Sequence, residues 1–122
     1  MAGVVVCYTL CVVSERFDPD ALDDDEPFEI DAQAAHLFKH PRLGLHDILD
    51  VWTSDPLFYP ARPPAHWLMV AEVRGNVLVV PLAPASSQDP SRCRPIGCCA
   101  ASVDLATNYR RDRDDYWTDE SR

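Results

Sequence analysis

Two apolar runs separated by a turn signal dominate the hydrophobic pattern of residues 67–83. In the first run, side chains at alternate positions form one apolar face and one face that becomes polar towards the turn, which is the period of a β-strand. The second run, over 77–82, is apolar on both faces, as is typical of a central strand. The turn signal is Arg74-Gly75-Asn76, in which Gly75 and Asn76 accept positive φ more readily than most residues. The pattern therefore predicts an antiparallel hairpin in the middle of a sheet.

Periodic apolar positions predict two helices before this hairpin. The first covers 32–40, follows a short strand over 28–31 and stops at Pro41. The second covers 45–53, and its apolar residues recur at i, i+3, i+4 and i+7. These residues are Leu45, Ile48, Leu49 and Trp52. The proline-rich stretch 57–66 then predicts an irregular connection.

A third strand and a last helix are expected after the hairpin. The strand covers 93–99, where Pro95 favours an edge position or a bulge. Ser102 is a suitable N-cap for a helix over 103–113, and its expected inward-facing residues are Val103, Ala106 and Tyr109. At the other end of the chain, the valine-rich residues 3–13 predict a strand with two open roles, an added edge strand or a homodimer contact.

Together these elements predict one α+β domain with a small antiparallel sheet of four to five strands and helices packed on one face. The expected domain covers 28–113. An extra strand over 1–13 and a solvated acidic linker over 14–27 precede it, and a frayed acidic tail over 114–122 follows it.

The net charge of -9 is confined to the two ends of the chain. The residues before Phe28 carry a net charge of -6 and those after Arg113 carry -3, so residues 28–113 are neutral overall. Within that segment Lys39 is the only lysine, and arginine supplies the remaining positive charge. Because the arginine guanidinium is suited to phosphate, the net charge does not exclude RNA as a partner.

Five cysteines, without a basic stretch before the apolar N-terminal run, indicate reduced thiols in a cytoplasmic protein without a membrane span. Cys93, Cys98 and Cys99 lack the paired spacing of zinc sites, which favours structural thiols. His36 and His40 share a helix face near His46 and Asp47, but the H-E-x-x-H pattern is missing. No metal and no cofactor are therefore expected.

Several short sequence motifs in the chain resemble those of the BrnT toxin family of the RelE/ParE-like group. They are Phe28-Glu-Ile-Asp31, Lys39-His40-Pro41, Asp55-Pro56 and Arg94-Pro-Ile-Gly-Cys-Cys-Ala-Ala-Ser102. The resemblance covers about 28–113 and rests on the order and spacing of these motifs. It implies a RelE-like fold and a metal-independent ribonuclease toxin in the cytoplasm, neutralised by a cognate antitoxin.

The chain departs from this family at Cys99 and Ala100, which stand where the family has adjacent arginine and lysine. RNA cleavage needs a general base, a general acid and cations around the phosphorane. The loss of two cations from one strand would weaken or abolish this chemistry.

Within this resemblance, the expected catalytic residues are His40, Arg74 and Arg94, and the expected substrate-binding residues are Lys39, Arg110 and Arg111. Each has a plainer alternative, because a histidine at a helix end serves as a cap and single arginines are common on surfaces. His66 and Tyr59 are further candidates for stacking with a base, or for simple packing of their loop.

Two hypotheses of function follow from the sequence. The first is a BrnT-like ribonuclease toxin, or a protein derived from one, that binds RNA and an antitoxin. The second is a non-catalytic module on the same scaffold that binds a protein partner; the acidic ends, Cys99 and Ala100 favour it.

Overall fold

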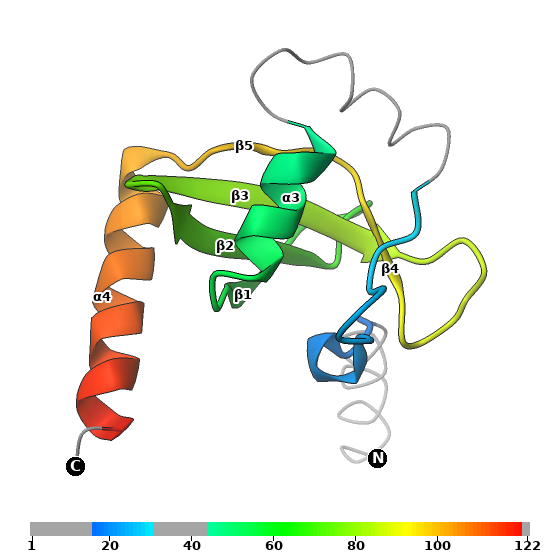
Figure 1. Cartoon of the computed structure of the whole chain (residues 1–122), viewed down its shortest axis with the longest axis horizontal. Coiled ribbons are helices and arrows are strands. Elements are labelled where there is room, and N and C mark those ends of the chain that lie inside the picture. Colours follow the sequence, from blue (N-terminus) through cyan, green and yellow to red (C-terminus); the bar gives the residue numbers. More distant parts are fainter. Residues whose placement is uncertain (1–15, 31–43, 121–122) are drawn as a thin grey trace, which may run out of the picture.

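The computed structural model of the chain describes residues 16–30 and 44–120 (Figure 1). The expected strand over 3–13 and the expected helix over 32–40 lie outside these ranges. The described elements, in chain order, are η1 (Pro19–Ala21), α3 (Leu45–Trp52), β1 (Leu57–Pro60), β2 (Trp67–Val73), β3 (Asn76–Pro84), β4 (Cys93–Pro95), β5 (Cys99–Ala100) and α4 (Val103–Glu120). The predicted α+β class with a small antiparallel sheet is confirmed.

The predicted hairpin forms strands β2 and β3 at the centre of this sheet. Val73 pairs with Asn76, so the turn consists of two residues. Arg74 has φ 50° and Gly75 has φ 84°. A two-residue turn that follows the twist of its strands needs positive φ at both positions. The turn residues Arg74 and Gly75 therefore lie within the predicted turn signal over 74–76.

The sheet order is β1-β2-β3-β4, with β5 pairing on the same side of β3 as β4. Strand β1 was not expected, because the prolines of 57–66 indicated an irregular connection. It nevertheless pairs antiparallel with β2, from Leu57 opposite Val70 to Pro60 opposite Trp67. Its apolar and aromatic residues favour a strand, and a proline is tolerated at the end of an edge strand.

The expected third strand divides into β4 and β5, as the proline at position 95 suggested. Leu82 pairs with Pro95 and Val79 pairs with Cys99, so three residues of the edge segment face two residues of β3. Pro81 lies opposite this interruption. It has no N–H to donate to the ladder, and its carbonyl accepts a hydrogen bond of 3.0 Å from the N–H of Ile96. The result is a bulge.

Both faces of the sheet are covered. We call the two groups of buried side chains the α3-side cluster and the α4-side cluster. The α3-side cluster joins one face of β2 and β3 to α3 and the 16–30 segment, and it includes Leu22, Phe28, Ile48, Val51, Met69, Ala71, Leu78, Val80 and Leu82. The α4-side cluster occupies the opposite face and contains Val70, Val77, Val79 and Tyr109. Figure 1 shows α3 across the sheet and α4 at its end.

Helix α3 has the predicted position but a different buried face. Ile48 and Val51 are fully buried, whereas Leu49 is 44% exposed. The backbone N–H of Gly44 donates to the carboxylate of Asp47 at 2.8 Å and defines the start of the helix. The expected stripe included Leu49 because the spacing of apolar residues does not specify which side chains of the helix contact the sheet.

Helix α4 begins at the predicted residue and continues to Glu120, beyond the expected end at 113. The Oγ of Ser102 accepts a hydrogen bond of 3.2 Å from the N–H of Leu105, which confirms the predicted N-cap. Tyr109 is 1% exposed, as expected for an inward residue, but Val103 is 82% exposed. The expectation that Val103 faces inward was wrong, because Leu105 and Ala106 of the first turns pack against the α4-side cluster instead.

The 16–30 segment packs against the domain although its carboxylates face solvent. Leu22 and Phe28 are buried, and the Nε1 of Trp67 donates to the carbonyl of Phe17 at 2.7 Å. Within 28–30, the described part of the expected strand over 28–31, Phe28 makes a bridge with Cys93. The acidic run is thus a packed segment of the fold, and a purely solvated linker does not describe it.

Candidate functional site

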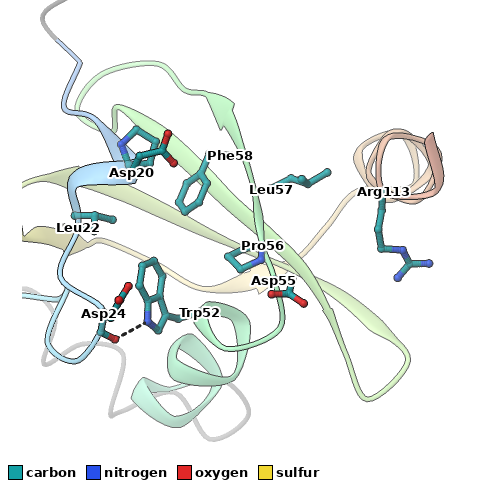
Figure 2. A pocket seen from close by; sticks show the side chains of 10 residues that line it. Asp20, Leu22, Asp24, Trp52, Asp55, Pro56, Leu57, Phe58 and Arg113 are labelled. Carbon is teal, nitrogen blue, oxygen red and sulfur yellow. Dashed lines mark hydrogen bonds between the residues drawn. The ribbon is translucent and has the colours of Figure 1, made fainter. Parts of the chain in front are cut away.

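A groove of about 560 Å³ lies beside the edge strand β1 (Figure 2). Its walls come from η1 and the residues after it, the end of α3, the turn into β1, and α4. The lining residues are Pro19, Asp20, Leu22, Asp24, Trp52, Asp55, Pro56, Leu57, Phe58 and Arg113. Three separate stretches of the chain therefore build the groove, and a volume of this size is typical of ligand sites.

The groove combines an apolar floor with an acidic rim. Figure 2 shows Phe58, Leu22 and Trp52 on one side of β1, with the carboxylates of Asp20 and Asp24 beside them. Asp55 adds a third carboxylate, and Arg113 is the only cation among the lining residues. Carboxylates next to aromatic rings attract cationic side chains, since both the charge and the ring face favour a cation.

Short-range contacts hold the acidic rim in place. The N–H of Asp20 donates to the Oδ1 of Asp18 at 2.9 Å, which caps η1. The Nε1 of Trp52 donates to the carbonyl of Asp24 at 3.3 Å, so α3 and the acidic run are joined directly at the groove. The side chains that carry the charge are thus presented by an ordered backbone.

Polar contacts between the sheet and α4 hold the helix that contributes Arg113 to the groove. Arg113 contacts Glu72 at 3.1 Å, and its guanidinium lies 5.5 Å from the ring centre of Tyr109. The Tyr59 hydroxyl donates to Asp112 at 2.7 Å. Burial and this carboxylate raise the pKa of Tyr59, so Tyr59 remains a neutral hydrogen-bond donor near neutral pH. These contacts fasten α4 to β1 and β2.

Arg74, a predicted catalytic residue, is paired with carboxylates of α3. Its Nη1 lies 2.8 Å from Asp50, and its Nη2 lies 3.2 Å from Asp47. The hydrogen bond from Arg74 holds the pKa of Asp50 below its usual range. The guanidinium of Arg74 is thus paired with two carboxylates of the same chain, which offset its positive charge.

The predicted catalytic arginines lie far apart. Arg94 pairs with Ala83 in the sheet, whereas Arg74 lies in the turn beside Asn76. Ala83 is seven residue steps along β3 from Asn76, which is about 23 Å at roughly 3.3 Å per residue. The structure therefore does not bring Arg74 and Arg94 into one site.

The other predicted site residues do not complete a basic face within the described ranges. His40 and Lys39 lie outside the described residues. Arg110 lies 3.4 Å from Glu72, and Arg111 lies 3.6 Å from Asp112, so each contacts a carboxylate.

The strand that lacks the expected family cations is exposed and neutral. Cys99 and Ala100 form β5, and both are exposed. The neighbouring Cys98 is half-buried, and burial raises its pKa to about 12. Cys93 is fully buried, and burial raises its pKa to about 12 as well. Thiols with such pKa values stay protonated, which agrees with structural roles.

The stacking candidate His66 and the described histidine His46 both contact other residues of the chain. The Nδ1 of His66 accepts a hydrogen bond of 3.0 Å from the N–H of Phe17, and the two rings stack at 5.5 Å. His46 lies 3.3 Å from Asp50 on α3, and His36 lies outside the described residues. Across residues 16–30 and 44–120, no three His, Cys, Asp or Glu residues are placed to hold a metal ion. None of the helices in those ranges has the length and apolar character of a membrane span.

The fold and the groove define an α+β protein with a five-stranded antiparallel sheet and an acidic groove at one edge strand. Comparison of the chain with family models, curated proteins and solved structures finds no match.

Sequence reasoning overlooked most of the groove residues. Asp20 and Asp24 belong to a run whose composition predicts a solvated linker, and Trp52 belongs to the apolar stripe predicted for the second helix. One local signal was available, because the apolar run Leu57-Phe58-Tyr59 next to the end of an amphipathic helix is typical of a strand. No local signal places the acidic run beside that strand, since more than 30 residues separate Asp20 from Leu57.

The Arg74–Asp50 contact gives a testable shift in titration. Substitution Arg74→Ala is expected to raise the pKa of Asp50 towards its usual range, as measured by NMR titration of the carboxyl group. Because the folded pKa is lowered, the stability contributed by this contact is present above the unfolded pKa of about 3.9. It is lost as the pH falls through the folded pKa. Arg62→Ala, which removes an exposed arginine from the loop before β2, should leave the titration of Asp50 unchanged.

Proposed function

We propose that this chain is a non-catalytic protein-binding module whose groove beside β1 takes a basic segment of a partner protein. The observation that carries the proposal is the lining of the groove, where Asp20, Asp24 and Asp55 surround an apolar floor that includes Trp52 and Phe58. Lysine and arginine have apolar stems and charged ends. Such side chains match a surface of this composition.

The ion pairs elsewhere in the structure favour binding over catalysis. Arg74, Arg110 and Arg111 each contact a carboxylate of the same chain. The ribonuclease hypothesis, with His40, Arg74 and Arg94 as its catalytic residues, stays a prediction. It would require a cationic pocket around a phosphate, and the groove has the opposite charge. The antitoxin partner implied by the family resemblance is likewise a prediction.

The test is titration calorimetry with a peptide in which arginine alternates with valine, at about 0.15 M salt to screen distant charges. Substitutions Asp20→Asn and Asp24→Asn are each expected to weaken binding about tenfold. A hydrogen bond to a charged group contributes about 1.5–3 kcal/mol, and a factor of ten corresponds to about 1.4 kcal/mol.

Asp25→Asn is the matched control. Asp25 is exposed and belongs to the same acidic run, but it does not line the groove. The Asp25→Asn substitution should therefore reduce the affinity for the peptide less than twofold. Equal losses from all three substitutions would mean that net charge, and not the groove, binds the peptide. Cleavage of RNA by the purified chain that is abolished by His40→Ala or Arg94→Ala would favour the ribonuclease hypothesis instead.

A further inference from the structure

We infer that the basic segment binds as an extended strand added to the outer edge of β1, with basic residues at alternate positions. This inference rests on the proposed function, because it specifies how the same groove holds its partner. It depends on three features: the position of β1 in the sheet, the direction of its backbone groups, and the division of the groove between two faces.

Strand β1 is the terminal strand of the sheet, and within the described residues its only strand partner is β2. The groove is lined by Leu57 and Phe58 of β1 and by Pro56, which precedes them. Leu57 packs with the α4-side cluster, whereas Phe58 packs with the α3-side cluster. A hollow lined by consecutive residues from opposite faces follows the edge of the strand, where the backbone of an added strand would lie.

The turn of the central hairpin determines which backbone groups of β2 face β1. Two residues with positive φ close this turn, so Val73 and Asn76 form a hydrogen-bonded pair. Every second residue from Val73 back along β2 therefore directs its N–H and C=O to β3, and the residues between them face the other way. The N–H of Glu72 agrees with this alternation, since it donates to the Oη of Tyr109 and not to β3.

The same alternation determines which backbone N–H and C=O groups of β1 point away from β2. Leu57 and Tyr59 stand opposite residues of β2 that face β1, so their N–H and C=O point inward. Phe58 and Pro60 consequently direct their backbone groups to the outer side. Proline has no N–H, so this edge presents one donor, from Phe58, and the carbonyl acceptors of Phe58 and Pro60. An edge richer in acceptors and bordered by carboxylates selects a donor-rich, basic strand.

The direction of its side chains determines which residue types suit alternate positions of the added strand. A residue opposite Phe58 would project to the same face as Phe58, where Figure 2 shows Asp20, Leu22 and Trp52. Its neighbours would project to the other face, beside Leu57 and Arg113. The first class of position suits lysine or arginine. The second suits apolar residues, which lie against Leu57, or an acidic residue, which pairs with Arg113.

Single backbone N-methylation of the arginine–valine peptide, one position at a time, tests the strand. Methylation removes one N–H and leaves the side chain unchanged. In the bound register, amides that donate to Phe58 and Pro60 alternate with amides that face solvent. We expect methylation at two alternate positions to weaken binding about tenfold or more, while the positions next to them change it less than twofold. Exchange of the Phe58 amide proton should also slow in the complex, since this N–H gains a partner.

The outcomes separate this inference from the proposed function. If the peptide binds and depends on Asp20 and Asp24, but all N-methyl positions behave alike and exchange at Phe58 is unchanged, strand addition is wrong and the groove proposal stands. If the unmethylated peptide does not bind, the proposed function and the strand both fail. A peptide with arginine at every third or fourth position should bind at least tenfold more weakly than the alternating one, and equal affinity would contradict an extended strand.

Discussion

Tyr109→Ala is expected to lower the free energy of unfolding by about 3–5 kcal/mol, the usual cost of truncating a buried aromatic residue. Tyr109 is 1% exposed and packs with Val70, Val77 and Val79 of the sheet. It is the only fully buried residue of α4 within 103–114, where side chains are described. Its loss should therefore remove most of the contact between the helix and this face. Urea denaturation followed by circular dichroism measures the change.

Two control substitutions separate the ring from the hydroxyl and from the helix. Tyr109→Phe retains the ring but leaves the N–H of Glu72 without the hydroxyl acceptor at 3.4 Å, so a cost of about 1 kcal/mol is expected. Val103→Ala, at a position that is 82% exposed, should change stability by less than about 0.5 kcal/mol. A cost for Tyr109→Ala no greater than that of Val103→Ala would show that α4 does not pack on the sheet as described.

Ile48→Ala should be the second large effect, at about 2–5 kcal/mol. Ile48 is fully buried between α3 and the sheet, in the α3-side cluster. Truncation removes apolar contact and leaves a cavity that its close-packed neighbours fill only in part. The same denaturation measurement applies.

Leu49→Ala is the matched control, because it removes a side chain of the same size from the next position of the same helix. Leu49 is 44% exposed, so its truncation should cost less than about 1 kcal/mol. Equal costs at the two positions, or a greater cost at Leu49, would support the apolar stripe expected from the sequence and contradict the helix orientation in the structure.

The elements predicted most accurately from the sequence depend on short-range patterns. The hairpin follows from alternating apolar residues and a turn that tolerates positive φ, and both signals lie within 67–83. Helix α3 follows from apolar spacing, and the start of α4 follows from the Ser102 cap. In each case the residues that specify the element are also its neighbours in space, so periodicity and capping are sufficient.

The errors occurred where a distant partner decides local structure. Strand β1 forms despite its flanking prolines, because β2 supplies hydrogen-bond partners for the edge. The acidic segment packs because Leu22 reaches the buried cluster and Trp67 donates to the carbonyl of Phe17. Composition alone predicted solvation there, since dense charge is normally solvated.

The candidate site depends even more on contacts between residues that are distant in the chain. The sequence identified Arg74 and Arg94 as residues suited to phosphate, but β3 holds them at opposite ends of the sheet and α3 pairs Arg74 with two carboxylates. The structure brings Asp20 and Phe58 together in the groove, although no local pattern in the sequence connects them.

By itself the sequence determined the α+β class, the central hairpin, the second helix and the confinement of excess acid to the chain ends. Periodicity and turn chemistry are local properties, and they are sufficient for these features. Tertiary structure alone decided which face of α3 is buried, which arginines are paired, and where the carboxylates of the acidic run lie. These features depend on contacts between residues that are distant in the chain, and only packing brings those residues together.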